Sequence, residues 1–401
     1  MQRIAISTAF DENTIRAIAH GAHERGVLSR RAIRNQSPLL AAAHAAHVIG
    51  PRSETLTRFI SNQRHRIASG ALPEDIRVAP SAELVRVLGG RVSSPVTHSI
   101  GNARWKVIFD RVASRVDFGD ADALISMPGS SLRTFEANRN RRLIFHEIDA
   151  HPRTRNDLLE QHYGRRRAVA EMFPDWFVRR IEEEISLSTH VLVPGRVVAD
   201  QMLAHGVPDS KIIRIPYGVD PTVFKPENEP RGHRSSRLQI VCTAQISLRK
   251  GIPFLIEAVR GKNVDLTLVG QVFDRQIVER LPSNVTLAGI LSAPQLADLY
   301  AESDLFVLPS VEDCFSLVVA EAAGAGLPVV TTNENGAHEV LSERHTIVNA
   351  GSVSELAHAI DSSHKLSHAE RRLISTEALE RGWSDWPTYA GSVLRATGII
   401  E

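Results

Sequence analysis

Short apolar runs alternate with helix-like stretches along the whole chain. The runs lie at residues 4–7, 123–127, 143–145 and 190–194 in the first half, and at 238–245, 264–270, 304–310 and 328–332 in the second. Each run has the length of a buried strand, and the intervening stretches, such as 12–26, are polar or helical in pattern. Strands that alternate with helices predict parallel sheets, with right-handed crossovers and helices on both faces.

One segment interrupts this pattern. Residues 215–236, IPYGVDPTVFKPENEPRGHRSS, are crowded with proline, glycine and serine, which are the residues of turns and linkers. A chain of 401 residues is long enough for two or three domains. We therefore expect two doubly wound domains, residues 1–214 and 215–380, with this segment at their junction.

Composition narrows the functions open to the chain. The 47 basic and 46 acidic residues give a formal charge of +1, which argues against a dedicated nucleic-acid binder. The two distant cysteines, Cys242 and Cys314, provide neither a disulfide framework nor a cysteine-rich metal site, so a reducing compartment is expected. No apolar run reaches the roughly 18 residues of a membrane span. Together these features predict a cytoplasmic protein.

Arginines cluster in the first half of the chain. One interpretation is a solvated surface in an arginine-rich composition. The other is a patch that binds an anionic acceptor or makes peripheral contact with the acidic inner face of a membrane. The residues concerned are Arg139, Arg141, Arg142, Arg165, Arg166, Arg167, Arg179 and Arg180.

The stretch 304–332, DLFVLPSVEDCFSLVVAEAAGAGLPVVTT, carries the strongest chemical signal. It predicts a buried strand, a short loop, a helix from about Phe315 to Gly324, and a second strand. In open α/β sheets ligands bind beyond the carboxyl ends of the strands. The loop therefore places Glu312 and Asp313 at a binding site and directs the N–H groups of the helix N-terminus toward it, as a phosphate site requires.

Glu321 lies on that helix among valine, alanine, leucine and glycine. A buried carboxylate is costly unless it meets hydrogen-bond donors, and the hydroxyls of a ribose would be suitable donors. The alternative is that Glu321 lies on the exposed edge of the helix or caps a neighbouring backbone group.

Two further loops follow predicted strands. In QISLRKGIPFLIEAV, residues 245–259, Arg249 and Lys250 fall between a strand and a helix, where two cations could neutralise a pyrophosphate leaving group. A solvated pair before a helix is the alternative. The loop at Gly289 and Ile290 lies at the end of a strand, where backbone groups could meet a nucleobase. No G-x-x-x-x-G-K-[ST] motif occurs, so a P-loop enzyme is excluded.

Several motifs in order resemble one known family. The segments IPYGVDPTVFKP, QISLRKGIPFLIEAV, LSAPQLADLYAESDLFVLPSVEDCFSLVVAEAAGAGLPVV and TNENGAHEV resemble the retaining glycosyltransferases of family 4. The resemblance covers residues 211–341 and is weaker before them, where HEIDAHPRTRNDLLEQHYG (146–164) looks like an acceptor-side segment of some members. It implies the GT-B fold, in which two doubly wound Rossmann-like domains face each other across a cleft. The first would bind the acceptor and the second the donor.

The resemblance also implies roles for single residues. Arg249 and Lys250 match the basic pair on the donor phosphates, Asp313 the acid beside the donor sugar, and Glu321 the acid that holds the ribose. His151 matches a histidine that faces the donor sugar from the first domain, with His146 as a nearby competitor and a purely structural histidine as the alternative. The loop that approaches the donor comprises Cys314, Phe315, Ser316 and Leu317, and the nucleobase contact comprises Gly289 and Ile290.

The sequence departs from the family pattern at several places. Glu312 precedes the first acid, and Cys314 and Ser316 stand where the family usually has glycine. Gln245 occupies a frequent arginine position, and the loop at 7–13 lacks the usual glycine pair.

The resemblance implies transfer of a sugar, with retention, from a nucleotide-diphosphate sugar to a saccharide, lipid-linked or small-molecule acceptor. No metal and no other cofactor is expected, because the cationic pair can replace Mg²⁺. The GT-B fold further implies that residues 381–401, with Trp383, Trp386 and Tyr389, cross back to the first domain. A non-catalytic sugar-nucleotide-binding protein on the same scaffold, and a sugar-nucleotide epimerase or hydrolase, remain as alternatives.

Overall fold

The computed structural model describes residues 2–8, 13–29, 33–34, 77–78, 95–226, 236–381 and 384–401. The chain divides into two compact units. The first comprises residues 1–147, 174–192 and 390–401, and the second comprises 148–173 and 193–389. The domain boundaries expected from the sequence, at 214/215 and 380/381, stay predictions. Trp383, residues 9–12 of the first loop and residues 227–235 of the expected linker lie outside the described residues.

The first sheet is parallel and has the order β3-β2-β1-β4-β5-β6-β7. Its long strands coincide with the predicted apolar runs, and β1 and β4 are buried along their whole length. Ile6 of β1 is paired with Ile125 of β4. The strands are β1 Ile4–Thr8, β2 Ile33–Arg34, β3 Arg77–Val78, β4 Ala123–Ser126, β5 Arg142–His146, β6 His190–Val193 and β7 Ile212–Arg214.

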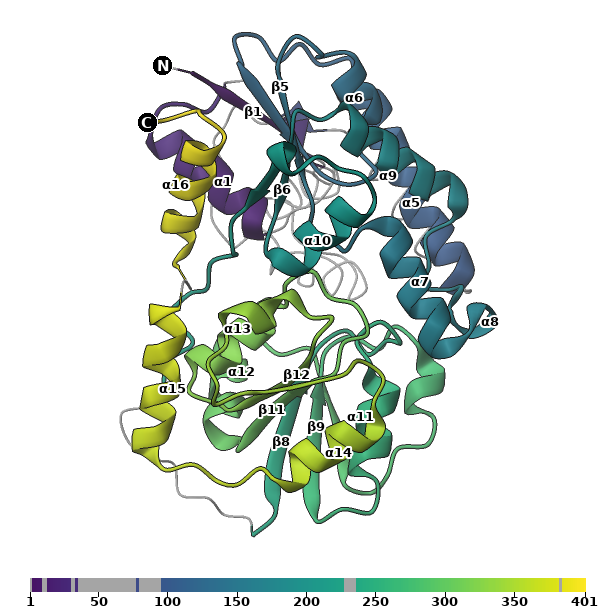
Figure 1. The fold of residues 1–401 in the computed structure, drawn as a ribbon, viewed down its shortest axis with the longest axis vertical. Coiled ribbons are helices and arrows are strands. Elements are labelled where there is room, and N and C mark those ends of the chain that lie inside the picture. Colours follow the sequence, from purple (N-terminus) through teal and green to yellow (C-terminus); the bar gives the residue numbers. More distant parts are fainter. Residues whose placement is uncertain are drawn as a thin grey trace, which may run out of the picture. The chain divides into compact units, whose positions relative to one another are not determined.

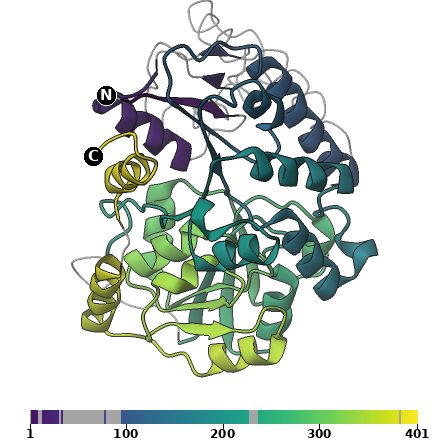
Figure 2. The ribbon, with the colours of Figure 1, turned by 45° about the horizontal axis from the view of Figure 1, so that its top comes forward.

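Helices of the first unit lie beside this sheet (Figure 2). They are α1 Asn13–Glu24, α5 Pro95–Ala113, α6 Leu132–Glu136, α9 Asp175–Leu187 and the end of α16 Trp386–Ala396. The end of α16 packs closely on α1, because a Cβ at Gly21 would stand 2.7 Å from the Cβ of Ala390. Helix α9 is joined to α5 by a buried ion pair between Arg180 and Asp110.

The second sheet is parallel and has the order β10-β9-β8-β11-β12-β13. Figure 1 shows helices α11 and α14 on one face and α12, α13 and α15 on the other. The strands are β8 Leu238–Thr243, β9 Val264–Val269, β10 Val285–Gly289, β11 Leu305–Leu308, β12 Val329–Thr332 and β13 Thr346–Val348. The helices are α11 Ile252–Val259, α12 Ala293–Glu302, α13 Leu317–Gly324, α14 Val353–Asp361 and α15 His368–Glu380.

The remaining elements of the second unit are helices α7 Pro152–Tyr163, α8 Arg165–Ala168 and α10 Arg196–Ala204, and the 3₁₀ turns Asp209–Lys211, Arg275–Val278 and Gly336–Val340. Tyr217 packs edge-on against Phe315 at 5.3 Å and Tyr389 at 5.9 Å, measured between ring centroids. The two parallel α/β units confirm the fold class predicted from the alternation of strands and helices.

The order of the second sheet determines where the candidate site lies. Strands β8, β11 and β12 are neighbours, so the loops after their carboxyl ends lie side by side. These loops carry Arg249 and Lys250 after β8, Glu312 and Asp313 after β11, and Asn335 after β12.

Across the described ranges, no helix is long and apolar enough to cross a membrane. The peripheral membrane contact expected from the arginines stays a prediction.

Candidate functional site

The loop after β8 is held against the loop after β11 by backbone groups. The N–H of Val311 donates to the carbonyl of Arg249 at 2.8 Å. Gly251, which precedes α11, has φ +68°, and a Cβ there would stand 1.8 Å from the carbonyl oxygen of Pro309. Only glycine fits both the left-handed backbone and this close approach. The sequence Arg-Lys-Gly therefore brings the two cations alongside the loop after β11 that carries Glu312 and Asp313, called the acidic loop below.

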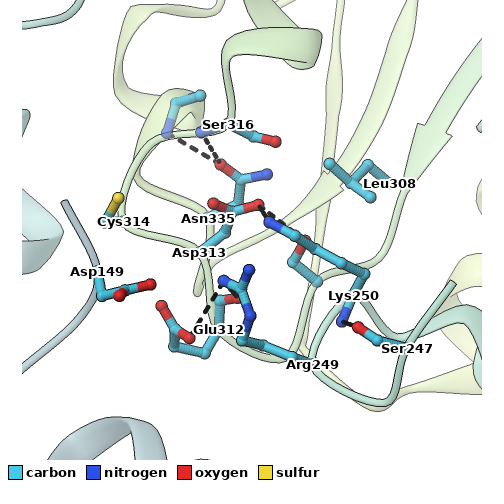
Figure 3. Close-up of polar contacts among 12 residues, drawn as sticks. Asp149, Ser247, Arg249, Lys250, Leu308, Glu312, Asp313, Cys314, Ser316 and Asn335 are labelled. Atoms are coloured by element: carbon cyan, nitrogen blue, oxygen red, sulfur yellow. Dashed lines mark hydrogen bonds and ion pairs between the residues drawn. The ribbon is translucent and has the colours of Figure 1, made fainter. Parts of the chain in front are cut away.

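Both cations of the loop are paired with carboxylates (Figure 3). Lys250 Nζ pairs with Asp313 Oδ2, and Arg249 Nη1 lies 3.4 Å from Glu312 Oε2. All four side chains are buried or nearly so, with exposed fractions of 17% for Arg249, 12% for Lys250, 1% for Glu312 and 6% for Asp313. The structure thus brings together Arg249, Lys250 and Asp313, and the donor-binding roles expected for them stay predictions.

The pKa shifts follow from this arrangement. Burial alone would raise the pKa of Asp313, but the charges of Lys250 and Arg249 outweigh it and hold that pKa below its usual value. Burial alone would lower the pKa of Arg249, but Glu312 and Asp149 outweigh it and raise that pKa further. The site therefore holds fixed positive and negative charges at neutral pH.

Asn335 connects the acidic loop to the loop after β12. The N–H of Asp313 donates to the carbonyl of Glu334, and the N–H of Gly336 donates to the carbonyl of Asp313, both at 3.0 Å. The Asn335 side chain accepts from the N–H of Ser316 at 3.4 Å and donates to Thr331 Oγ1 at 3.1 Å. No role was expected for Asn335 from the sequence, where it lies within the segment TNENGAHEV. Its position directly after a strand next to β11 is the signal that could have found it.

Helix α13 begins beside these loops, with Ser316 at its N-cap. The sequence predicted its start at about Phe315 and its end at Gly324, and the helix runs from Leu317 to Gly324. Within the part of the chain that the structure describes, the N–H groups of Leu317 and Val318 make no hydrogen bond. Such free N–H groups at a helix N-terminus favour an anion.

A segment before α7 also contacts the acidic loop. The N–H of Ala150 donates to Glu312 Oε1 at 3.2 Å, and the thiol of Cys314 donates to the carbonyl of Ile148. Cys314 thus makes a side-chain hydrogen bond that a glycine at this position could not make. Asp149 lies between these contacts, beside Glu312 and Arg249 (Figure 3), and pairs with Arg155 at 3.1 Å.

His151 follows this segment and caps helix α7. Its Nδ1 accepts from the N–H of Arg153 at 3.4 Å, and its ring stacks on His205 at a centroid distance of 3.8 Å. Burial, and next His205, lowers the pKa of His151 to about 3, so the ring is neutral at physiological pH. His146 is buried in β5, where burial lowers its pKa to about 3. The catalytic role expected for His151 stays a prediction.

Glu321 lies on α13, about one turn beyond the first residue of the helix. Within the described residues its carboxylate makes no hydrogen bond or ion pair, and burial raises its pKa to about 7. Gly289 ends β10 with φ +71°, and Ile290 beside it is 76% exposed. Within the described residues, none of these three residues makes a hydrogen bond or ion pair with the loops that carry the charged pairs. Their ribose and nucleobase roles therefore stay predictions.

The described residues include no group of three or more His, Cys, Asp or Glu side chains placed to hold a metal ion. The charged groups of the site are cation–carboxylate pairs and a helix N-terminus, which together suit an anionic ligand with several hydroxyls.

The segment that carries these loops is similar in sequence to a known protein family. Residues 237–365 match the family model described as Glycosyl transferases group 1. D-inositol 3-phosphate glycosyltransferase of Paenarthrobacter aurescens (strain TC1) is 28% identical over 211 residues, which are 46% of this chain and 52% of that protein. GDP-mannose-dependent alpha-mannosyltransferase of Mycobacterium tuberculosis (strain CDC 1551 / Oshkosh) is 25% identical over 209 residues, 49% of this chain and 54% of that protein. The chain thus spans about half the length of these relatives.

Solved structures match over the whole chain. Sucrose-phosphate synthase from Thermosynechococcus elongatus has a TM-score of 0.66 at 15% identity and covers 99% of each chain. Anabaena HepE in complex with UDP-glucose has a TM-score of 0.61 at 14% identity and covers 100% of each. At these identities the likeness establishes the fold.

The two parallel-sheet units and these structural matches define a protein of the GT-B fold with two Rossmann-like domains. Within it, residues 237–365 form a domain of the Glycosyl transferases group 1 family. This confirms the family resemblance found in the sequence.

Proposed function

We propose that the protein is a retaining glycosyltransferase that moves a sugar from a nucleotide-diphosphate sugar to a saccharide, lipid-linked or small-molecule acceptor. The observation that carries the proposal is the cationic pair Arg249 and Lys250 at the carboxyl edge of the second sheet, next to the free N–H groups of α13. Two cations and a helix N-terminus favour a bound diphosphate over a neutral ligand of comparable size.

Each group then has a distinct task. Lys250 and Arg249 exchange part of their contact with Asp313 and Glu312 for the donor diphosphate. Glu321, which has no partner among the described residues, accepts hydrogen bonds from the ribose hydroxyls. Asp313 lies beside Lys250 and so next to the sugar that the diphosphate carries.

The reaction requires a leaving diphosphate stabilised where its charge develops. The bond from the anomeric carbon to the diphosphate oxygen breaks, and a bond from the same carbon to the acceptor oxygen forms. The acceptor proton passes to the leaving phosphate. Once the donor is bound and these contacts are exchanged, Arg249, Lys250 and the N–H groups of Leu317 and Val318 face the diphosphate, so they stabilise the developing negative charge without further reorganisation. The charge pairs make a metal ion unnecessary for this step.

A non-catalytic sugar-nucleotide-binding protein is the second candidate. This candidate is favoured by Cys314, which stands where the resemblance leads us to expect glycine. The Cys314 thiol donates a hydrogen bond to the carbonyl of Ile148. Such a protein would bind the donor and transfer nothing, whereas an epimerase or hydrolase would convert the donor without any acceptor.

A thermal-shift panel of UDP-, GDP- and ADP-sugars is the first experiment. A donor at about 100 times its Kd stabilises the fold by about 2.7 kcal/mol, so one nucleotide should raise the melting temperature by several degrees. UDP-glucose is included because the Anabaena HepE structure contains it. The stabilising donor is then incubated with panels of saccharide, lipid-linked and small-molecule acceptors. Glycosylated product is expected, and absence of a shift with every nucleotide sugar would refute the proposal.

A further inference from the structure

We infer that Glu171, assisted by Tyr163, is a positioning residue that fixes the backbone of Arg249 for the donor diphosphate. This inference rests on the proposed function, because it assigns Arg249 to the diphosphate. Glu171 belongs to the segment after α8. It lies 77 residues before Leu248 in the loop after β8 that carries Arg249 and Lys250, called the basic loop below. None of the family motifs quoted above includes Glu171.

Glu171 holds two consecutive backbone N–H groups of the basic loop. Its Oε1 accepts from the N–H of Leu248 at 2.7 Å, and its Oε2 accepts from the N–H of Arg249 at 2.9 Å. The Glu171 residue is 7% exposed, so both bonds are shielded from water. Bonds from N–H groups to an ionised carboxylate are among the stronger hydrogen bonds in proteins. One buried side chain therefore fixes the loop at the residue that carries the guanidinium.

Tyr163 holds the same loop from helix α7. Its hydroxyl donates to the carbonyl of Leu248 at 2.9 Å, and its ring stacks on Phe254 at a centroid distance of 5.1 Å. The Leu248 side chain is 2% exposed and packs in an apolar cluster with Leu159, Ala168 and Met172. Leu248 is thus held through its N–H, its carbonyl and its side chain.

The bonds to Arg249 fix its backbone on both sides. Its N–H donates to Glu171, and its carbonyl accepts from Val311 at 2.8 Å. A guanidinium binds phosphate oxygens through a rigid planar fork, so its contribution depends on the direction in which its backbone presents it. The N–H of Lys250 donates instead to Ser247 Oγ at 3.4 Å. Glu171 should therefore act on donor binding through Arg249 and not through Lys250.

Calorimetric titration of UDP, GDP and ADP into the full chain tests this with two double-mutant cycles. Glu171→Gln keeps one acceptor oxygen but turns an NH₂ group toward a backbone N–H. It should raise the Kd of the nucleotide that binds by about tenfold or more, the scale of a lost hydrogen bond to a charged group. With Arg249→Ala present, Glu171→Gln should change the Kd by less than about twofold. With Lys250→Met present, it should keep its full effect.

Two further variants separate positioning from folding. Tyr163→Phe removes one neutral hydrogen bond to the same loop and should weaken binding by only a fewfold. Glu171→Asp keeps the charge and should recover part of the affinity lost in Glu171→Gln. If Glu171→Gln fails to fold, the same cycles are run with Tyr163→Phe, which must again show its effect only when Arg249 is present.

The outcomes distinguish the inference from the proposed function. A wild-type chain that binds none of the three nucleotides overturns the proposed function and the inference with it. A wild-type chain that binds one of them, with Glu171→Gln either harmless or fully additive to Arg249→Ala, overturns the positioning role of Glu171 alone.

Discussion

The pair formed by Lys250 and Asp313 allows stability and function to be separated. Their side chains are 12% and 6% exposed. Lys250→Met keeps the length of the side chain but removes the ammonium group, which leaves the Asp313 carboxylate with Ser310 Oγ at 3.2 Å and the nearby charge of Arg249. Removing one partner of a buried pair costs about 3–5 kcal/mol. Because the charge of Arg249 still acts on Asp313, we expect the free energy of unfolding to fall by about 3 kcal/mol, the lower end of this range.

The matched control removes both charges. Lys250→Met combined with Asp313→Asn leaves no unpaired charge, so it should recover most of the lost stability. It should not recover function, because the diphosphate still lacks its ammonium partner. Turnover should stay about 10²-fold below wild type, which is the scale of losing one preorganised contact to the developing charge.

The pH dependence provides an independent check. In the wild type the pKa of Asp313 is held below its usual value, so its stabilisation is present at neutral pH and is lost as pH falls through that low pKa. Without Lys250, less positive charge opposes the effect of burial, and the pKa of Asp313 rises. The Asp313 carboxyl of the variant then takes up a proton on folding. The difference in stability between the variant and the wild type should therefore shrink as pH is lowered from 8 to 5.

Urea denaturation of the three proteins at several pH values, with donor turnover measured in parallel, tests this reasoning. A double variant that is no more stable than Lys250→Met would refute the stabilising role of the pair, and a Lys250→Met variant that turns over the donor at the wild-type rate would refute the functional role of Lys250.

Three further predictions concern other parts of the chain. Burial raises the pKa of Glu321 to about 7, so its own contribution to stability falls as pH rises from 5 to 8, while His146 and His151, whose pKa values burial lowers, contribute in the opposite direction. The melting temperature of Glu321→Gln should therefore rise relative to that of the wild type as pH rises from 5 to 8, and the same substitution should weaken nucleotide binding by roughly 1–3 kcal/mol in calorimetry. His151→Asn retains a residue that can cap α7 but removes the ring that stacks on His205, so its melting temperature should fall; reduced turnover at a temperature where the variant is folded would place His151 at the sugar, and a lower melting temperature with unchanged turnover would make it structural. Truncation after Arg381 removes Tyr389 and with it a ring contact of Tyr217, so it should lower the melting temperature and increase binding of an apolar dye; an unchanged melt with full activity would refute the crossing predicted for this segment.

The strands were predictable because their apolar runs are short and are bounded by polar residues. The run at 304–310 became β11, buried at every position, and the run at 328–332 became β12. The short strands β2 and β3 have two residues each, too few for a hydrophobic pattern. The sequence therefore indicated the class of fold more clearly than the number of strands.

The candidate site was predictable only as far as local sequence determines it. Arg249 and Lys250 could be placed opposite Asp313 because all three follow neighbouring parallel strands. The contacts of Ile148 and Ala150 with the acidic loop, and of Glu171 with the basic loop, join segments 77 or more residues apart. No periodicity or spacing indicates such pairings, because they depend on how distant segments pack.

A crystal structure of the chain with the nucleoside diphosphate found in the thermal-shift panel tests the donor site most directly. We predict that the diphosphate lies within hydrogen-bond distance of the Arg249 guanidinium and Lys250 Nζ, with the ribose hydroxyls on the Glu321 carboxylate. A nucleotide bound elsewhere, with Lys250 still paired to Asp313 and Glu321 still without a partner, would contradict the assignment of this site to the donor.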